Sequence, residues 1–183
     1  LYSMDYSAQK IKWILNFKKS TLKGDVDLFL SQTIVYKNNN IIIASENIVS
    51  SFNTNTAQRN WELSVKALLK PILTNNYTYI YAQNDLLICV DNNTGKVIWS
   101  KNIYSGLDKK QKKNKIGLFY DLKIVNKKLN LYSQEGYLLS FNYNDGIMNL
   151  FKKISKNGIN SEVFFIKDNM LLIDNKNRLL KYN

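Results

Sequence analysis

The chain of 183 residues contains no histidine and only one cysteine, and these two scarcities exclude several kinds of site. Without histidine, the sequence lacks the usual general base near neutral pH and the commonest zinc ligand. A single cysteine can form neither a disulfide within the chain nor a cysteine-cluster metal site. That cysteine, Cys89, lies among Leu87, Ile88 and Val90, which predicts a small buried residue of a strand.

Recognised catalytic and membrane-spanning motifs are also missing. The sequence has no nucleophile elbow, no Walker loop and no dinucleotide-binding fingerprint. No apolar run approaches the roughly eighteen residues of a membrane-spanning helix, and no signal peptide is present. We therefore expect no catalytic, cofactor-binding or metal-binding residue in the chain. Membrane association is expected only through an N-terminal anchor that would precede these residues.

What the sequence does contain is a repeat. In four places an Asp or Asn ends a short apolar run and is followed eight residues later by Trp or Leu. The pairs are Asp5/Trp13, Asn53/Trp61, Asp91/Trp99 and Asn142/Leu150, and Asn183 ends a fifth run. These five anchor residues are roughly 40 to 50 residues apart, a spacing typical of stacked structural repeats.

The pattern within each repeat indicates strands. Apolar residues alternate along the chain, as in Ile11, Trp13 and Leu15, and side chains two apart share one face of a sheet. Two further apolar runs precede each of the last four anchor runs: the first at 28–36, 72–73, 118–125 and 163–166, the second at 41–44, 79–82, 129–132 and 170–173. Four strands at this spacing are typical of a propeller blade. We predict an all-β chain, a β-propeller of four-stranded antiparallel blades, with about four blade units in one partial domain spanning residues 1–183.

One segment fits this pattern less well. Residues 57–70 are rich in good helix formers, and Trp61, Val65 and Leu68 would line one helical face. The spacing of the repeat makes the first half a strand, whereas the second half, up to Pro71, could form a helical turn. A long helix here would mean that this blade has been misread.

The turn after each anchor has its own chemistry. The Asp91 carboxylate can accept backbone N–H groups two or three residues on, and Gly95 can adopt a left-handed conformation without steric cost. Gly146 stands at the same place in the following unit. Gln9 and Ala57 occupy this place in the first two units, where a left-handed residue costs about 1–2 kcal/mol. We therefore expect those two turns to be built differently.

Residues 90–99, Val-Asp-Asn-Asn-Thr-Gly-Lys-Val-Ile-Trp, resemble the repeat of the quinoprotein-like (PQQ-type) β-propellers, whose consensus runs roughly Ala-x-Asp-x-x-Thr-Gly-x-x-x-Trp. The other units match this consensus less completely. The resemblance implies that Trp13, Trp61 and Trp99 dock between neighbouring blades, while Leu150 would lack the indole N–H. Rings of this family usually have seven or eight blades, so the chain resembles a segment of a larger ring. The alternative is a β-sandwich in which these tryptophans are simply buried.

The resemblance also bears on function. Quinone-dependent dehydrogenases of this family use a calcium ion, a catalytic Asp and, in the alcohol-oxidising branch, a vicinal cysteine pair, which this sequence lacks. The nearer resemblance is to the non-enzymatic branch, the BamB-type lipoproteins of the outer-membrane β-barrel assembly machinery. It implies a periplasmic protein-binding scaffold without cofactor, whose partner would be the barrel-forming subunit. The alternatives are a fragment of a PQQ-dependent dehydrogenase and a generic propeller adaptor.

The net charge of +12 has two interpretations. One is an anionic partner, which would be an acidic protein, phospholipid head groups or nucleic acid. The other is a genome rich in AT codons, which encode Lys, Asn and Ile. The densest run gives a candidate partner-binding basic loop, made of Lys109, Lys110, Lys112, Lys113 and Lys115, although such runs are often merely solvated. Nucleic acid is disfavoured because the aromatic residues follow strand periodicity and form no stacking platform.

Overall fold

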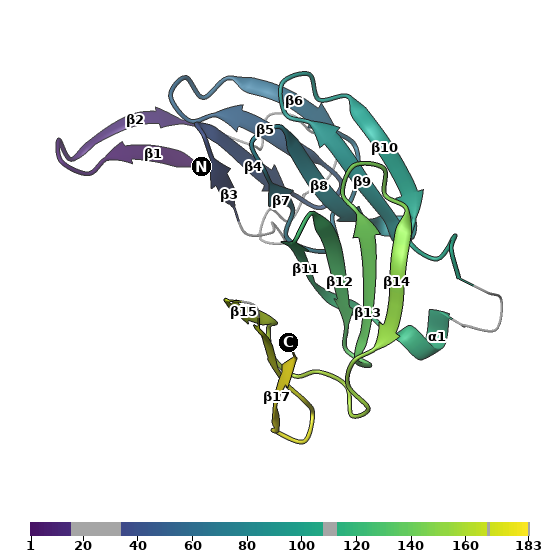
Figure 1. Cartoon of the computed structure of the whole chain (residues 1–183). Coiled ribbons are helices and arrows are strands. Elements are labelled where there is room, and N and C mark those ends of the chain that lie inside the picture. Colours follow the sequence, from purple (N-terminus) through teal and green to yellow (C-terminus); the bar gives the residue numbers. More distant parts are fainter. Residues whose placement is uncertain (16–33, 108–112, 168, 183) are drawn as a thin grey trace. The chain divides into compact units, whose positions relative to one another are not determined.

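The computed structural model describes residues 1–15, 34–107, 113–167 and 169–182. Nearly all regular structure in these ranges is β-strand, arranged as separate antiparallel sheets (Figure 1). The one α-helix among them is the single turn α1 (Lys113–Ile116). The chain forms two compact units, one of Leu1–Gln83 with Cys89–Ile98 and the other of Asn84–Ile88 with Trp99–Asn183. The all-β prediction is confirmed.

The first unit begins with a hairpin of β1 (Tyr2–Asp5) and β2 (Lys10–Ile14). The next sheet has four antiparallel strands in chain order: β3 (Val35–Lys37), β4 (Asn40–Ala44), β5 (Val49–Asn53) and β6 (Arg59–Leu63). A second four-stranded sheet consists of β7 (Ile72–Leu73), β8 (Tyr77–Ala82), β9 (Leu86–Asp91) and β10 (Val97–Asn102). Its strands β9 and β10 contribute residues to both compact units.

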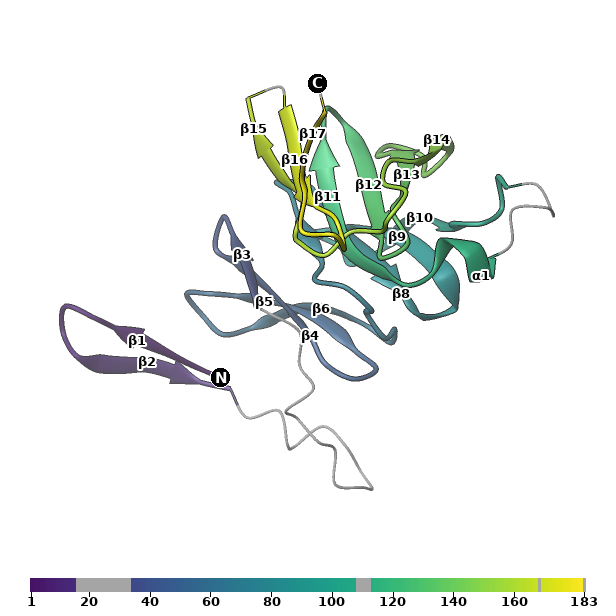
Figure 2. The same cartoon turned by 90° about the horizontal axis from the view of Figure 1, so that it is seen from below.

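The second unit contains two further sheets. The four-stranded sheet consists of β11 (Phe119–Val125), β12 (Lys128–Ser133), β13 (Tyr137–Asn142) and β14 (Met148–Lys153). The three-stranded sheet consists of β15 (Phe164–Ile166), β16 (Asn169–Ile173) and β17 (Leu179–Tyr182). Figure 2 gives a second view of the same strands. The four-stranded antiparallel blade expected from the repeat is therefore present three times. The predicted runs overlap strands of these sheets, and those at 163–166 and 170–173 overlap β15 and β16 of the three-stranded sheet; residues 28–33 lie outside the described ranges.

The ambiguous segment at residues 57–70 begins as a strand, as the spacing of the repeat predicts. Arg59–Leu63 is β6, and residues 64–70 contain no helix, so the helical turn considered there is not found. The reason lies in the backbone bonds, since Leu68 N donates to Tyr81 O at 2.8 Å and Gln83 N to Lys66 O at 2.8 Å. Because these backbone N–H and C=O groups pair with the end of β8, they are not available for the hydrogen bonds of a helix.

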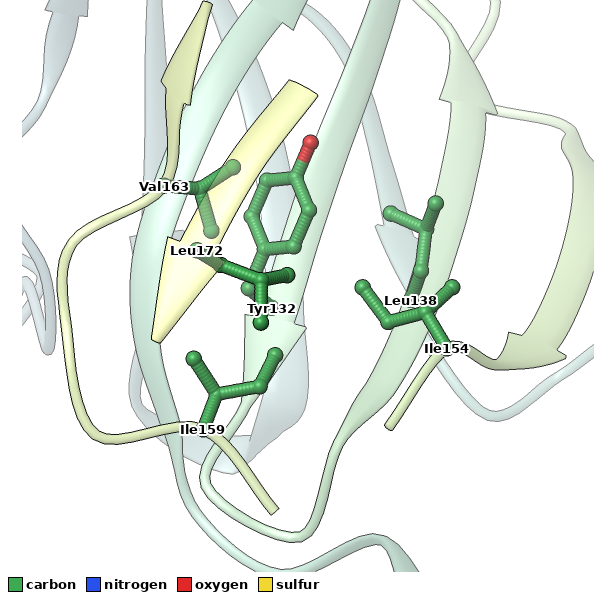
Figure 3. Packing of buried hydrophobic residues seen from close by; sticks show 6 residues of the cluster. All are labelled: Tyr132, Leu138, Ile154, Ile159, Val163 and Leu172. Atoms are coloured by element: carbon green, nitrogen blue, oxygen red, sulfur yellow. The ribbon is translucent and has the colours of Figure 1, made fainter. Parts of the chain in front are cut away.

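Each unit buries apolar side chains between neighbouring sheets. In the first unit, Ile41, Ile43 and Phe52 of the β3–β6 sheet form a cluster against which Trp13 and Leu15 pack. In the second unit, the cluster is drawn in Figure 3 and joins the β11–β14 sheet to the β15–β17 sheet and the segment before it. Its buried members are Tyr132, Leu138, Ile154, Ile159, Val163 and Leu172.

The prediction for the single cysteine is confirmed. Cys89 is 1% exposed within β9, and its burial raises the pKa of the thiol to about 11. A thiol that stays protonated in an apolar strand is unreactive, so Cys89 contributes packing.

Candidate functional site

The anchor residues close their turns with their own side chains. Asp91 Oδ1 accepts the backbone N–H groups of Asn93 at 3.0 Å and Thr94 at 2.8 Å, and also the Thr94 hydroxyl at 2.9 Å. These bonds, led by the one from the Thr94 backbone, lower the pKa of the Asp91 carboxyl. The same arrangement recurs at the other described anchors: Asp5 accepts from Ser7 and Ala8, Asn53 from Asn55 and Thr56, and Asn142 from Asn144.

The expectation that the turns at Gln9 and Ala57 are built differently is wrong. Gln9 has φ 51° and Ala57 φ 60°, close to the 70° of both Gly95 and Gly146. Ala57 N donates to Asn53 O at 2.9 Å, as Gly95 N donates to Asp91 O at 2.9 Å. The hydrogen bonds of the turn therefore offset the cost of a left-handed non-glycine residue, which is about 1–2 kcal/mol.

Two of the tryptophans donate a hydrogen bond to the anchor turn of the next repeat along the chain. Trp61 Nε1 donates to Asn92 O at 3.0 Å, and Trp13 Nε1 donates to Thr54 O at 2.7 Å. Asn92 and Thr54 each follow an anchor directly. Both hydrogen bonds lie within the first compact unit, and each connects one sheet to its neighbour.

The residue after the anchor also bonds to its own sheet. Asn92 N donates to Asn76 O at 2.9 Å, and Thr54 N donates to Asn39 O at 2.8 Å. Asn76 and Asn39 lie in the turn between the first two strands of their sheets. Two hydrogen bonds in series thus connect three groups: this turn, the residue after the anchor, and the indole of the preceding repeat.

Asn92 completes the site around Trp61. Its side chain is 4% exposed, and its Oδ1 accepts the Thr78 hydroxyl at 2.7 Å. Its Nδ2 donates to Thr74 O at 3.0 Å and to Asn75 O at 3.2 Å. A buried amide with both ends bonded fixes the carbonyl that receives the indole.

Two of the tryptophans also pack directly on the glycine of the next turn. A Cβ added to Gly95 would lie 2.3 Å from Trp61 Cβ, and one added to Gly146 would lie 2.7 Å from Trp99 Cε3. Real Cβ atoms do not approach other carbons so closely, so glycine is required by contact as well as by φ. Trp61 is 6% exposed, whereas Trp13 and Trp99 are both half-buried, although only Trp99 precedes a turn with glycine.

The structure brings three of the predicted residues together, because Trp61, Asp91 and Gly95 meet around one turn. Sequence reasoning missed Asn92 and Thr54, whose backbone carbonyls accept the indole N–H groups. Their position directly after each anchor was the available signal.

The candidate basic loop is described only in part. Lys113 forms an ion pair with Asp85, and its Nζ lies 5.6 Å from the centre of the Tyr104 ring. Burial, and then the Asp85 charge, raise the pKa of Tyr104 to about 12. Lys115 is exposed in α1, while Lys109, Lys110 and Lys112 lie outside the described residues. The Lys113 charge is thus compensated within the chain, and that of Lys115 faces solvent.

Among the described residues, His, Cys, Asp and Glu side chains form no group of three that could hold a metal ion. Over the same part of the chain, no helix has the length and apolar character needed to span a membrane.

Comparison with known proteins places these sheets in a known fold. A family model described as outer membrane protein assembly factor BamB matches residues 16–101. The chain is similar to the structure of BamB from Moraxella catarrhalis, with a TM-score of 0.64 and 15% identity over 100% of this chain and 51% of that one. It is also similar to Sqt1 from Saccharomyces cerevisiae, with a TM-score of 0.67 and 12% identity over 100% of this chain and 52% of that one.

A quinohemoprotein alcohol dehydrogenase from Comamonas testosteroni is similar as well, with a TM-score of 0.51 and 16% identity over 66% of this chain and 20% of that one. The chain therefore spans about half the length of BamB and of Sqt1. No curated protein sequence matches it. At these identities the solved structures show the fold, and they confirm the predicted propeller blades.

Proposed function

Because the chain is a BamB-like β-propeller of PQQ-type repeats, we propose that it is a non-enzymatic scaffold that binds a protein partner in outer-membrane protein assembly. The observation that carries this proposal is the match of residues 16–101 to the family of the outer membrane protein assembly factor BamB. The similarity to BamB from Moraxella catarrhalis along the whole chain supports it.

The geometry of the anchor turns is consistent with such a role. Trp61, Asn92 and Gly95 interlock two neighbouring sheets through a hydrogen bond and a close contact. Trp13 makes the hydrogen bond and Trp99 the glycine contact, and we propose that all three indoles hold successive blades. A surface fixed before binding loses less conformational entropy when a partner docks, which favours affinity.

The proposed partner is the barrel-forming subunit of the outer-membrane assembly machinery, and the proposed location is the periplasm. Charge supports a contact through the basic loop, because Lys115 is exposed and carries no ion pair among the described residues. An acidic patch on the partner would complement this loop and accelerate association.

A binding titration tests the proposal. The purified chain is titrated with the purified periplasmic domains of the barrel-forming subunit, and the dissociation constant is measured. We expect Lys115→Glu to weaken binding several-fold at low salt. The matched control is Lys156→Glu, which reverses the charge of another exposed lysine outside the loop. Absence of binding by the wild-type chain would contradict the proposed partner, and equal effects of the two variants would contradict the proposed loop.

The similarity to a quinohemoprotein alcohol dehydrogenase supports one second candidate, a segment of a quinone-dependent enzyme. The purified chain is incubated with the quinone and calcium, and dye-linked oxidation of alcohols is measured. Bound quinone together with alcohol oxidation would replace the scaffold proposal. The similarity to Sqt1 leaves a generic propeller adaptor as a third candidate, which failure of the partner titration would favour.

A further inference from the structure

Corresponding rows of side chains in two sheets differ sharply in polarity. In the β3–β6 sheet, one cross-strand row consists of Val35, Ile42, Ser51 and Trp61. In the β11–β14 sheet, the same row consists of Lys123, Asn130, Ser140 and Leu150. The serine is kept, but the apolar residues on either side of it are replaced by Asn130 and by the smaller Leu150.

Two buried oxygens of the second row have no hydrogen-bond partner in the described part of the chain. Asn130 is 8% and Ser140 2% exposed, and neither Asn130 Oδ1 nor Ser140 Oγ has a hydrogen-bond partner among the described residues. The matching Ser51 of the other sheet is 1% exposed, but its Oγ accepts Asn60 Nδ2 at 3.2 Å. Buried polar atoms without any partner are rare in native proteins, because desolvating them is costly.

Tyr132 adds a third such group on the same face. It lies two residues from Asn130 on β12, so both side chains point to one side of the sheet. Figure 3 shows its ring packed among Val163, Leu172 and Ile159, with the hydroxyl directed away from Ile159. The hydroxyl is buried, and no hydrogen bond of ordinary geometry reaches it in the described part of the chain. Burial raises the pKa of Tyr132 more than the neighbouring Asn130 side chain lowers it, so this oxygen keeps its proton and can donate.

A charged pair lies at the β11 end of these rows. Asp121 and Lys123 face Tyr132 and Asn130 across the strands, and Lys123 Nζ lies 3.2 Å from Asp121 Oδ2. Their side chains are 15% and 31% exposed, so this end of the row is in contact with solvent. The ammonium group of Lys123 disfavours a cation among these oxygens, whereas a neutral molecule pays no such penalty.

We propose that Asn130, Ser140 and Tyr132 form a binding site for ordered water between the β11–β14 and β15–β17 sheets. Water supplies the donor that Asn130 Oδ1 needs, and it can donate to or accept from the hydroxyls of Ser140 and Tyr132. Two to four polar partners are what a buried water requires, and this face provides three. The proposed water occupies space that the larger apolar side chains of Ile42 and Trp61 fill beside Ser51 in the other sheet. This proposal is independent of the proposed function.

Nuclear Overhauser effects between water and the protein test the site in solution. In the labelled chain, we expect cross-peaks from long-lived water to the ring protons of Tyr132 and to the backbone amides of residues 130 and 140, groups that the variants below retain. In the variant Asn130→Ile/Ser140→Ala, these cross-peaks are expected to be lost while the amide spectrum elsewhere is retained. The isoleucine copies Ile42 of the other sheet. The matched control is Ser155→Ala, because Ser155 is also buried without a partner for its hydroxyl but lies outside this row. It should leave the cross-peaks unchanged.

A crystal structure of the wild-type chain provides the second test, which does not depend on the folding of any variant. We expect an electron-density peak for water within hydrogen-bonding distance of at least two of the three oxygens. A direct bond between Asn130 and Ser140 with no water beside it would overturn the proposal. So would the absence of long-lived water in the wild-type chain, or cross-peaks that persist in the double variant.

Discussion

The β3–β6 and β11–β14 sheets share strand order and the chemistry of the anchor turn but differ in the residue eight positions after the anchor. In the first sheet that residue is Trp61, which is 6% exposed and donates to Asn92 O at 3.0 Å. In the second it is Leu150, which is 40% exposed. The anchor side chains of both sheets nevertheless bond to their own turns. The turn and the docking side chain are therefore separable parts of the repeat.

Truncating the two residues gives the largest expected contrast. Trp61→Ala should lower the free energy of unfolding by about 3–5 kcal/mol, because it leaves a large cavity and an unused carbonyl at Asn92. Leu150→Ala should lower it by only about 1 kcal/mol, since the side chain is partly solvated in the native state. Urea titrations followed by circular dichroism measure both values. Equal losses would show that the indole contributes no more than an ordinary apolar side chain.

Adding a methyl group to the turn sharpens the same comparison. Gly95→Ala should lower the free energy of unfolding by about 2–4 kcal/mol, from the left-handed backbone and the clash with Trp61 together. The loss should shrink in a Trp61→Ala background, which a double-mutant cycle measures. Ala57→Gly is the matched reverse change and should stabilise by about 1 kcal/mol. A loss at Gly95 that is unchanged without the indole would contradict the proposed contact.

Acid titration separates the charged anchor from the neutral ones. The pKa of Asp91 is lowered in the folded chain from an ordinary value of 3.8, chiefly by the Thr94 backbone bond. The stabilisation from this carboxylate is therefore present above that value and is lost as the pH falls through the lower folded-state pKa. In thermal melts from about pH 5 to pH 2, Asp91→Asn should lose less stability than the wild-type chain. Parallel curves would show that Asp91 does not contribute to the acid sensitivity.

The smallest effect is expected at the basic loop. Lys113→Gln removes the ion pair with Asp85, but the Lys113 side chain is 61% exposed. Exposed pairs of this kind contribute about 0–1 kcal/mol, so the midpoint in urea should barely move. A loss as large as that of Gly95→Ala would mean that the loop supports the fold itself.

The strands could be predicted because alternation of apolar residues is a local signal that survives divergence of the repeat. The left-handed backbone at Ala57 could not, because intrinsic preference is outweighed there by bonds from Asn53 that sequence does not display. The helical turn considered for residues 64–70 is absent for a similar reason. The backbone there pairs with the neighbouring strand, and this tertiary pairing outweighs the helix propensity of the residues.

The candidate site was predicted in part. Trp61, Asp91 and Gly95 were identified from their spacing, and the structure brings them together. Asn92 was missed although it directly follows an anchor, because the chain is rich in asparagine and sequence alone does not show which of these side chains is buried. Which asparagine is buried depends on the packing of the sheets.

The contact between an indole and the glycine of the following turn has a consequence for divergence. A Cβ at that glycine would lie 2.3 Å from Trp61 Cβ or 2.7 Å from Trp99 Cε3, so a methyl group there requires the indole upstream to move. Substitutions in adjacent repeats are then not independent of each other. Among homologues, loss of the glycine and loss of the preceding tryptophan should covary, although they lie 34 residues apart for Trp61 and Gly95 and 47 apart for Trp99 and Gly146.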